Sequence, residues 1–229
     1  MKILKFTVLV GLAAFASCAS PTFRTFHKPV VFDAQRKQLS LEYMQQRYGI
    51  EADSAYIEPK IIVLHWTAIP TLEASFNAMN PAVLPGHREA IGSASALNVS
   101  TQFLVDRDGT IFRQLPDTAF ARHVIGLNYN AIGVENVGGS NAPLTRAQLK
   151  ANEELVRYLK ARYDIEYLIG HYEYQNFEGH PLWKEKDAGY RTQKVDPGKK
   201  FMKKIRRRLK DLDLKAAPTA PMEVLVPEI

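Results

Sequence analysis

A single cysteine among 229 residues is the first scarcity in this sequence. One cysteine excludes an internal disulfide framework and any zinc module built from cysteine pairs. Long hydrophobic stretches are scarce as well. The apolar run Phe6–Ala16 has eleven residues, which is too short for a membrane-spanning helix of about 20 residues. The sequence also has no internal repeat.

The overall composition is that of a globular protein with a packed core. Hydrophobic residues make up 46%, charged residues 24% and aromatic residues 10%, which excludes a disordered or collagen-like chain. The length suits one domain with extensions, or two very small ones. Lysine and arginine (30) exceed aspartate and glutamate (24), giving a net charge of +6. This charge favours an anionic partner such as nucleic acid, anionic lipid or an acidic wall polymer without choosing among them.

The first 17 residues have the features of a secretory signal peptide. Lys2 and Lys5 form a short basic region, the apolar run follows, and small residues then surround Cys18. A buried N-terminal helix is the alternative, but Ser20-Pro21-Thr22 ends the apolar pattern abruptly. We therefore expect an exported protein. Cleavage before Cys18 removes both lysines and lowers the net charge from +6 to +4, which weakens the argument for nucleic acid.

The segment Phe15-Ala16-Ser17-Cys18 resembles a bacterial lipobox, in which the cysteine is lipidated and becomes the first mature residue. Phe15 departs from the pattern, which usually has Leu or another aliphatic residue there. Lipidation at Cys18 implies a protein anchored to a membrane of the bacterial periplasm or cell envelope. Cleavage by an ordinary signal peptidase implies a secreted soluble protein instead.

The rest of the sequence predicts one α/β domain, with a central mixed β-sheet flanked by helices. Residues 18–55 are mixed and polar, with a helical candidate at 39–47, and we expect a surface arm. Residues 56–213 form the domain, and the Pro/Ala tail at 214–229 is expected to be disordered.

Hydrophobic periodicity predicts the elements of this domain. Short apolar, β-branched runs predict strands at 61–64, 99–105, 110–115, 131–137 and 165–169. Helical spacing predicts helices at 71–80, 145–163 and 199–212, with a loop at 81–98.

Two histidines directly follow predicted strands, His65 after residues 61–64 and His171 after Tyr167-Leu168-Ile169-Gly170. Histidines that leave adjacent strands in the same direction could share a metal ion, for which imidazole is the commonest ligand. Asp196 is the candidate third ligand, and three protein ligands with an open fourth position form a catalytic zinc site. Taken alone, each histidine is more often a packed residue than a ligand, and the spacings of 106 and 25 residues are no local metal motif.

Five blocks of sequence support the metal site. They are Ile62-Val63-Leu64-His65-Trp66-Thr67, Phe103-Leu104-Val105-Asp106-Arg107-Asp108-Gly109-Thr110-Ile111, Ala131-Ile132-Gly133-Val134-Glu135, Ile169-Gly170-His171 and Lys194-Val195-Asp196-Pro197-Gly198. In this order they resemble the zinc N-acetylmuramoyl-L-alanine amidases, the amidase-2 family, which is related to the peptidoglycan recognition proteins and to amidase-type phage lysozymes. The resemblance covers residues 57–205.

The resemblance implies a zinc hydrolase with one Zn²⁺ per chain. It implies cleavage of the amide bond between N-acetylmuramic acid and L-alanine in peptidoglycan or muropeptides, for wall turnover or recycling. His65, His171 and Asp196 match the zinc ligands. Glu135 matches the acidic residue that acts with the metal-bound water, and Lys194 matches the basic residue that faces the substrate carbonyl.

His123 and Trp183 are candidate substrate contacts. His123 matches the histidine of a Trp-His pair that lines the family's site, although Arg122 stands in the place of the tryptophan. A hydrogen-bonded rim histidine is the alternative for His123. Trp183 lies in the long aromatic connection 172–193, and connections of this length are commonly functional. Packing within the connection is the alternative for Trp183.

Three rival functions remain open on the sequence alone. A recognition-type relative binds peptidoglycan without cutting it, but such relatives usually lack a zinc ligand. A two-histidine, one-carboxylate iron oxygenase normally has its carboxylate close after the first histidine, where this chain has Trp66, Thr67 and Ala68. The helix predicted at 199–212 is basic and amphipathic. It could bind nucleic acid or a membrane surface, although a charged helix face is usually just solvated. We expect no nucleic-acid partner and a monomer.

Overall fold

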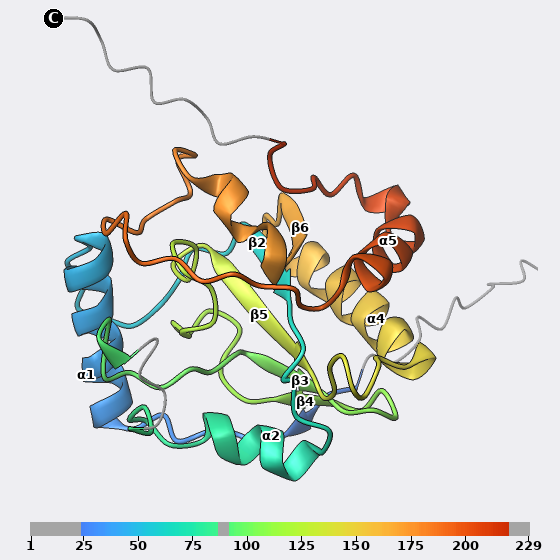
Figure 1. Cartoon of the computed structure of the whole chain (residues 1–229), viewed down its shortest axis with the longest axis horizontal. Coiled ribbons are helices and arrows are strands. Elements are labelled where there is room, and N and C mark those ends of the chain that lie inside the picture. The colour runs from blue at the N-terminus through green and yellow to red at the C-terminus, as the bar shows by residue number, and fades with distance from the viewer. Residues whose placement is uncertain (1–23, 87–91, 220–229) are drawn as a thin grey trace, which may run out of the picture.

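The structure, a computed structural model of the chain, describes residues 24–86 and 92–219. At the centre of these residues is a sheet of six strands in the order β1-β4-β3-β5-β2-β6 (Figure 1). The strands are β1 (Phe26–His27), β2 (Ile61–Leu64), β3 (Phe103–Val105), β4 (Ile111–Arg113), β5 (Ala131–Asn136) and β6 (Tyr167–Gly170). β3 and β4 run antiparallel and the other neighbours run parallel, so the predicted mixed sheet is confirmed.

Helices surround this sheet (Figure 1). They are α1 (Ala34–Tyr43), the π-helical turn η1 (Met44–Tyr48), α2 (Leu72–Met79), α4 (Arg146–Arg162), the 3₁₀ segment η2 (His171–Phe177), α5 (Lys199–Arg208) and the 3₁₀ segment η3 (Lys210–Leu212). α4 begins at a capping box between Thr145 and Gln148, which satisfies amide groups that a helix start leaves without partners. Thr71 caps α2 with its side chain. The helices predicted over 71–80, 145–163 and 199–212 are confirmed.

The two faces of the sheet pack against different parts of the chain. Side chains alternate along a strand, and even-numbered residues such as Ile62 and Val134 join α4 and α5 in the largest apolar cluster, the main cluster. Odd-numbered residues such as Ile61 and Ala131 join a second cluster with η2 and Val124. The odd-numbered residues that follow β2 and β6 therefore lie on the face away from α4 and α5.

The surface arm predicted at residues 18–55 is wrong for its described part. The helix there begins at Ala34 rather than at residue 39, and it continues through η1. Tyr43, Met44 and Tyr48 from this segment are buried in the main cluster. The segment is therefore part of the domain and carries some of its core.

Arg36 shows why the sequence pattern does not place α1 in the core. Its side chain is buried, and Nη2 donates to the carbonyl oxygens of Met79, Asn80 and Pro81 at 2.9, 3.0 and 2.5 Å. The last carbonyl groups of a helix lack partners within it and carry partial negative charge, so Arg36 caps α2. Burial lowers the pKa of Arg36 to about 10, against the opposing effect of Asp33.

The disordered tail predicted from residue 214 is wrong for its described part, 214–219. Leu168 N donates to the carbonyl oxygen of Lys215 at 3.0 Å, which places the tail beside β6. Asn176 Nδ2 donates to the carbonyl oxygen of Pro218 at 2.8 Å. Backbone pairing with an edge strand holds this stretch, and composition does not reveal such pairing.

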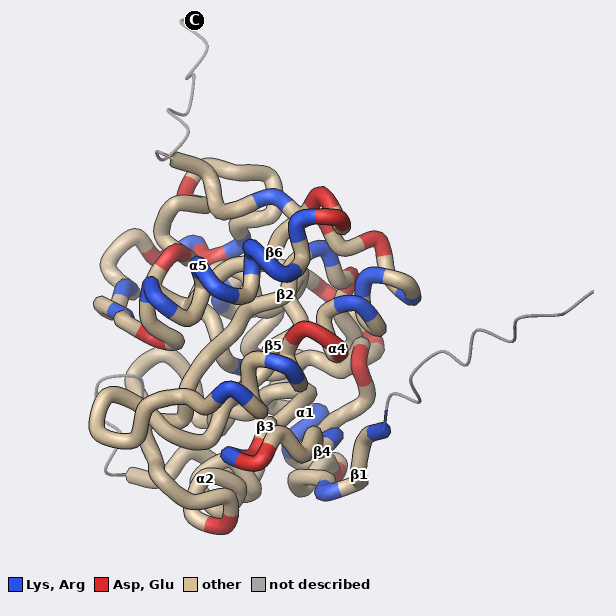
Figure 2. Tube along the Cα trace, turned by 90° about the vertical axis from the view of Figure 1, so that its right-hand side faces the viewer, with Lys and Arg blue, Asp and Glu red and all other residues tan. Residues whose placement is uncertain are grey.

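Lysines and arginines make up most of α5 (Figure 2). Met202 and Ile205 on its inner side are buried in the main cluster, whereas Lys203 and Lys204 are exposed. The predicted basic amphipathic helix is therefore confirmed. Within the described ranges, no helix is long and apolar enough to cross a membrane. The predicted signal peptide and Cys18 lie outside the described residues.

Candidate metal centre and cleft

Strand register places three functional candidates side by side. β2 lies between β5 and β6, and Leu64 pairs with Val134 on one side and with Gly170 on the other. The next residue of each strand or strand end is His65, Glu135 or His171. These three residues therefore lie side by side at the carboxyl ends of β2, β5 and β6, which we call one edge of the sheet. The prediction that both histidines leave adjacent strands in the same direction is confirmed.

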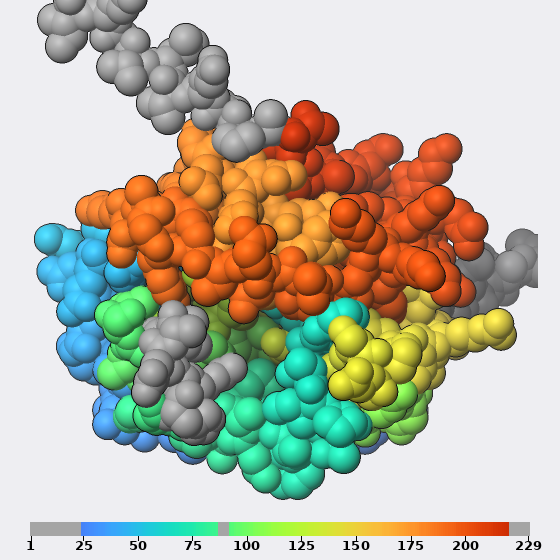
Figure 3. Space-filling view, in the orientation of Figure 1, coloured from blue at the N-terminus to red at the C-terminus, as the bar shows by residue number. Residues whose placement is uncertain are grey.

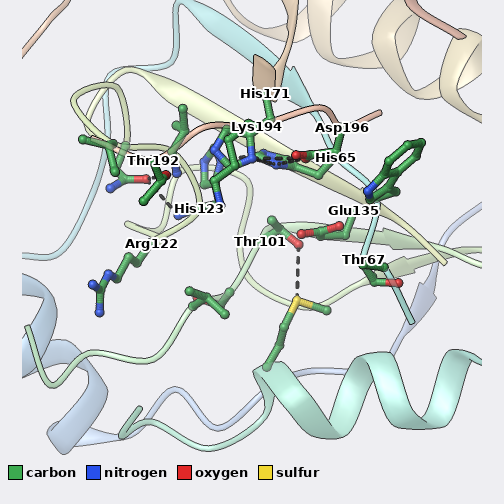
Figure 4. Close-up of a pocket in the computed structure, with 18 of the residues that line it drawn as sticks. His65, Thr67, Thr101, Arg122, His123, Glu135, His171, Thr192, Lys194 and Asp196 are labelled. Atoms are coloured by element: carbon green, nitrogen blue, oxygen red, sulfur yellow. Dashed lines mark hydrogen bonds and ion pairs between the residues drawn. The ribbon is translucent and has the colours of Figure 1, made fainter. Parts of the chain in front are cut away.

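His65, His171 and Asp196 converge into a tight triangle (Figure 4). The two Nδ1 atoms are 3.0 Å apart, and Asp196 Oδ2 lies 3.2 Å from Nδ1 of His65 and 3.1 Å from Nδ1 of His171. Tyr172 N donates to the carbonyl oxygen of Asp196 at 3.1 Å, which fixes the Asp196 segment beside η2. All three side chains are buried.

The triangle fits a tetrahedral metal ion. Bonds of about 2.0–2.1 Å from zinc to nitrogen or oxygen give ligand atoms roughly 3.3 Å apart in tetrahedral geometry. The three observed separations, from 3.0 to 3.2 Å, are close to that value. Two imidazole nitrogens and a carboxylate oxygen are also ligands that zinc accepts. The residues brought together are the three predicted ligands.

The local electrostatics keep the candidate ligands in their metal-binding forms. Burial lowers the pKa of His171 to about 4, the neighbouring His65 adds to this effect, and Asp196 opposes it. Burial tends to raise the pKa of Asp196, but contacts with His171 and His65 outweigh it and hold that pKa well below its usual range. At neutral pH, His171 is therefore neutral and Asp196 is charged, as metal binding requires.

The triangle lies in a cavity of about 280 Å³ that Glu135 and Lys194 also line. Figure 3 shows the hollow between the orange segment that follows β6 and the teal region around α2. Lys194 and Asp196 both line the cavity, whereas Val195 between them is 68% exposed. The predicted general base and the predicted carbonyl contact thus open onto the same space as the ligands.

Arg122 forms part of one wall of this cavity. Its Nη1 donates to the carbonyl oxygens of Ser95 and Leu97 at 3.0 and 2.6 Å, and its Nη2 donates to Tyr190 Oη at 3.0 Å. The guanidinium also lies over the ring of Tyr43, 5.4 Å from its centroid. Arg122, which replaces the tryptophan of the family pattern, joins α1, the 92–98 loop and the segment after η2.

His123 lines the cavity, but its ring nitrogens are engaged within the protein. Nδ1 lies 3.0 Å from Nε2 of His65, and Nε2 lies 3.2 Å from the carbonyl oxygen of Ala131. Burial lowers the pKa of His123 well below its usual value, and the neighbouring His65 adds to this effect. Both ring nitrogens therefore already have partners within the protein, as the alternative of a hydrogen-bonded histidine expects, and a substrate contact of His123 stays a prediction.

Trp183 does not line the cavity and instead anchors the segment in which it lies. Its ring stacks on Tyr174 with centroids 6.2 Å apart, and Nε1 donates to the carbonyl oxygen of Glu185 at 3.0 Å. A Cβ added at Gly126 would lie 2.6 Å from the Trp183 ring, so glycine makes room for it. These contacts match the alternative of packing within the connection, and a substrate contact of Trp183 stays a prediction. Tyr190 of the same segment does line the cavity.

Two further residues shape the site and were not singled out by sequence. Asn128 Oδ1 accepts from the backbone N–H groups of His123 and Val124 at 2.9 and 2.8 Å. A Cβ added at Gly133 would lie 2.9 Å from the His123 ring and 2.7 Å from Thr101 Cγ2. A glycine inside a strand does signal close approach of another group, whereas Asn128 has no local signal.

The fold and the site together define an α/β protein with a candidate metal centre at the ends of neighbouring parallel strands. The family model Amidase_2, described as N-acetylmuramoyl-L-alanine amidase, matches residues 55–199, which is more than half of the chain. The chain belongs to this family.

Comparisons with individual proteins agree with this membership. The chain is 35% identical to the endolysin of Escherichia phage T7 and 34% identical to that of Enterobacteria phage T3, each over 83 residues. Each match takes in 34% of this chain and 55% of the relative, so the chain spans about half the length of the curated relatives it matches. Among solved structures, the N-acetylmuramoyl-L-alanine amidase LysC from Clostridium intestinale URNW shares the fold, with a TM-score of 0.50, 23% identity and coverage of 69% of this chain and 88% of LysC.

Proposed function

We propose that this chain is a zinc-dependent amidase that hydrolyses the bond between N-acetylmuramic acid and L-alanine in peptidoglycan or its fragments. The observation that carries the proposal is the buried triangle of His65, His171 and Asp196, which opens onto one cavity with Glu135 and Lys194. Membership of the Amidase_2 family supports the choice of bond.

Zinc suits this ligand set and this chemistry. When bound to three protein ligands, zinc acts as a Lewis acid that polarises a carbonyl and lowers the pKa of a water to ~7. The chain supplies two neutral imidazoles and one carboxylate, which leave the centre with a net charge of about +1. All three of these side chains are buried, which strengthens their electrostatic interaction with a bound cation.

Glu135 is the proton carrier in this proposal. Of the two carboxylates that line the described cavity, Asp196 contacts the histidines, which leaves Glu135 as the base. Glu135 takes a proton from the attacking water and gives it to the nitrogen of the departing L-alanine. The carbonyl oxygen gains negative charge during attack, and the Lys194 ammonium group stabilises that charge.

A recognition module that binds peptidoglycan without cutting it is the second candidate, and the site disfavours it. Such a module needs neither a complete ligand set nor a base. This chain keeps His65, His171 and Asp196 within hydrogen-bond distance of one another, and keeps Glu135 at the same sheet edge. Hydrolysis is therefore the better account of the site.

Product analysis tests the proposal. The purified protein is incubated with sacculi and, separately, with anhydro-muropeptides, and the products are identified by mass spectrometry. We expect stem peptides that begin with a free L-alanine, together with muramic acid that has lost its peptide. Binding of both substrates without either product would favour the recognition module.

We further propose that the protein is exported and lipidated at Cys18, which lies outside the described residues. The basic start, the short apolar run and the lipobox-like segment support this proposal. Mass spectrometry of the mature protein from bacterial cells should find an N-terminal cysteine with a diacylglycerol mass, which the variant Cys18→Ser lacks. A mature chain with an unmodified N-terminus would contradict lipidation.

A further inference from the structure

A chain of hydrogen bonds leads from the backbone of β5 to the metal centre. Nε2 of His123 lies 3.2 Å from the carbonyl oxygen of Ala131, and Nδ1 of His123 lies 3.0 Å from Nε2 of His65. Nδ1 of His65, on the other side of that ring, lies in the ligand triangle. Figure 4 shows the rings of His65 and His123 next to each other beside Asp196.

The carbonyl oxygen of Ala131, at one end of this series of hydrogen bonds, determines the direction of each bond in it. A carbonyl oxygen can only accept, so His123 Nε2 must carry the proton that it donates to Ala131. The other nitrogen of a neutral imidazole, Nδ1, is then an acceptor. His65 must therefore donate from Nε2 to His123. His65 Nδ1 is left with a lone pair directed toward Asp196 Oδ2, 3.2 Å away.

We propose that His123 is a positioning residue that holds His65 in the one tautomer able to ligate a metal through Nδ1. Two lone pairs, on His65 Nδ1 and on the Asp196 carboxylate, then face each other. A cation between them offsets the repulsion of these lone pairs, so the arrangement favours metal binding. The inference rests on the proposed function in that it takes the cation to be zinc. A hydrogen-bond partner on the outer nitrogen of a ligating histidine also raises its basicity and fixes its ring.

Three parts of the chain hold His123 in this position. Gly133 lets the His123 ring approach β5, because a Cβ there would lie 2.9 Å from the ring. Asn128 Oδ1 accepts from His123 N at 2.9 Å and fixes its backbone. Asn128 Nδ2 in turn donates to Tyr48 Oη at 2.9 Å. Tyr48 belongs to η1, outside the family match at residues 55–199, so the N-terminal helical segment supports the metal centre through Asn128 and His123.

The tautomer can be measured directly in the wild-type protein. Nitrogen-15 NMR of the full chain, stripped of metal at neutral pH, distinguishes a proton on Nδ1 from one on Nε2. We expect His65 and His123 both to carry their proton on Nε2. A proton on Nδ1 of either ring would overturn the proposal, and this experiment requires no variant to fold.

Zinc affinity then separates positioning from packing. His123→Phe keeps the ring but removes the acceptor, and we expect zinc binding, measured by competition with a chelator, to weaken about 10–100-fold. His123→Asn returns an oxygen near the place of Nδ1, and we expect it to restore affinity to within about threefold of wild type, a smaller loss than in His123→Phe. His180→Phe, which changes a histidine that contacts Tyr167 away from the triangle, serves as the matched control and should bind zinc normally.

Two results would overturn the inference: unchanged zinc affinity in His123→Phe, or equal weakening in His123→Phe and His123→Asn. Either result would reduce His123 to a packing residue. Failure of the proposed function has a different signature, because wild-type protein would then bind zinc without cutting peptidoglycan or bind no zinc at all. In each of those cases the tautomers of His65 and His123 can still be measured in metal-free wild-type protein, so this measurement tests the inference separately from the proposed function.

Discussion

Glu135 and Lys194 occupy places that the sequence order alone does not explain. Glu135 reaches the site because β5 pairs in register with β2, which aligns it with His65. Lys194 reaches it because the chain after η2 returns past the sheet edge and is tied there by the bond from Tyr172 N to Asp196. The two residues therefore approach the candidate ligands from different parts of the chain. In the proposed mechanism Glu135 takes a proton, and Lys194 offsets the negative charge on the carbonyl oxygen.

Replacement of Glu135 tests the proton-transfer step. We expect Glu135→Gln to lower kcat about 10²–10⁴-fold, because an amide of the same shape cannot accept the proton. Zinc content, measured by metal analysis, should remain one per chain. Glu51→Gln, at an exposed position, is the matched control and should retain full activity. Near-normal turnover in Glu135→Gln would remove Glu135 from the mechanism.

Replacement of Lys194 tests the stabilisation of charge on the carbonyl oxygen. We expect Lys194→Met to lower kcat about 10²–10³-fold with a smaller effect on KM, because the charge develops mainly in the transition state. Lys203→Met, on the exposed side of α5, should leave both constants unchanged. A change confined to KM would instead assign Lys194 to substrate binding.

The sequence predicts the three candidate ligands far better than their surroundings. His65 and His171 end recognisable strands, and the family resemblance supplies Asp196. The contact between His65 and His123 depends on how the 119–130 segment crosses β5, with Gly133 and Asn128 deciding the fit. Such contacts depend on tertiary packing, so no periodicity in the chain encodes them.

At the scale of elements, α1 and η1 differ most from expectation. Their residues are largely polar, and a helix with a polar pattern is expected at the surface. Arg36 and Tyr48 nevertheless use buried hydrogen bonds to hold α2 and Asn128. Arg47 also forms ion pairs with Glu185 and Asp187 across to the segment after η2. The N-terminal segment therefore braces two sides of the cleft.

Loss of the Arg36 cap should destabilise the fold. We expect Arg36→Met to lower the free energy of unfolding by about 2 kcal/mol, because the end of α2 loses buried, charge-assisted hydrogen bonds. Urea unfolding followed by circular dichroism gives this value. Lys37→Met, the exposed neighbour on the same helix, should change it by less than about 0.5 kcal/mol. Equal effects of the two substitutions would show that Arg36 contributes little as a cap.

At the scale of the whole molecule, the sheet arranges core and site on one framework. The even-numbered side chains of β2, β5 and β6 build the main cluster with α4 and α5. The odd-numbered series leads to His65, Glu135 and His171 at one edge. Fold class and most elements follow from hydrophobic periodicity, whereas the ends of the domain do not. Residues 24–55 and 214–219 join it through side-chain caps and backbone pairing that composition cannot reveal.

Acid should destabilise the metal-free protein. Burial lowers the pKa of His171 to about 4 and that of His123 well below its usual value, whereas both titrate near ~6.5 when unfolded. Between these values the unfolded chain binds more protons, so the free energy of unfolding falls as pH falls. We expect a slope of up to about 1.4 kcal/mol per pH unit for each histidine. Urea unfolding at pH 7, 6 and 5 measures it.

His171→Ala is the control for this pH dependence. Removal of one of the two buried histidines that have a strongly lowered pKa should reduce the slope between pH 6.5 and 5 by about half, whatever its effect on stability at pH 7. A free energy of unfolding that stays constant or rises from pH 7 to pH 5 in the wild-type protein would contradict the assigned burial of both rings.

The central claim, metal-dependent cleavage of the muramyl amide, is tested most directly by counting new alanine amino groups. Hydrolysis of that bond frees the α-amino group of L-alanine, so N-terminal labelling of sacculi digests reports it alone. We predict that labelled alanine accumulates with zinc-loaded protein, stops after chelation and returns when zinc is restored. Labelling that persists after zinc removal, or new reducing sugar ends without labelled alanine, would contradict the account.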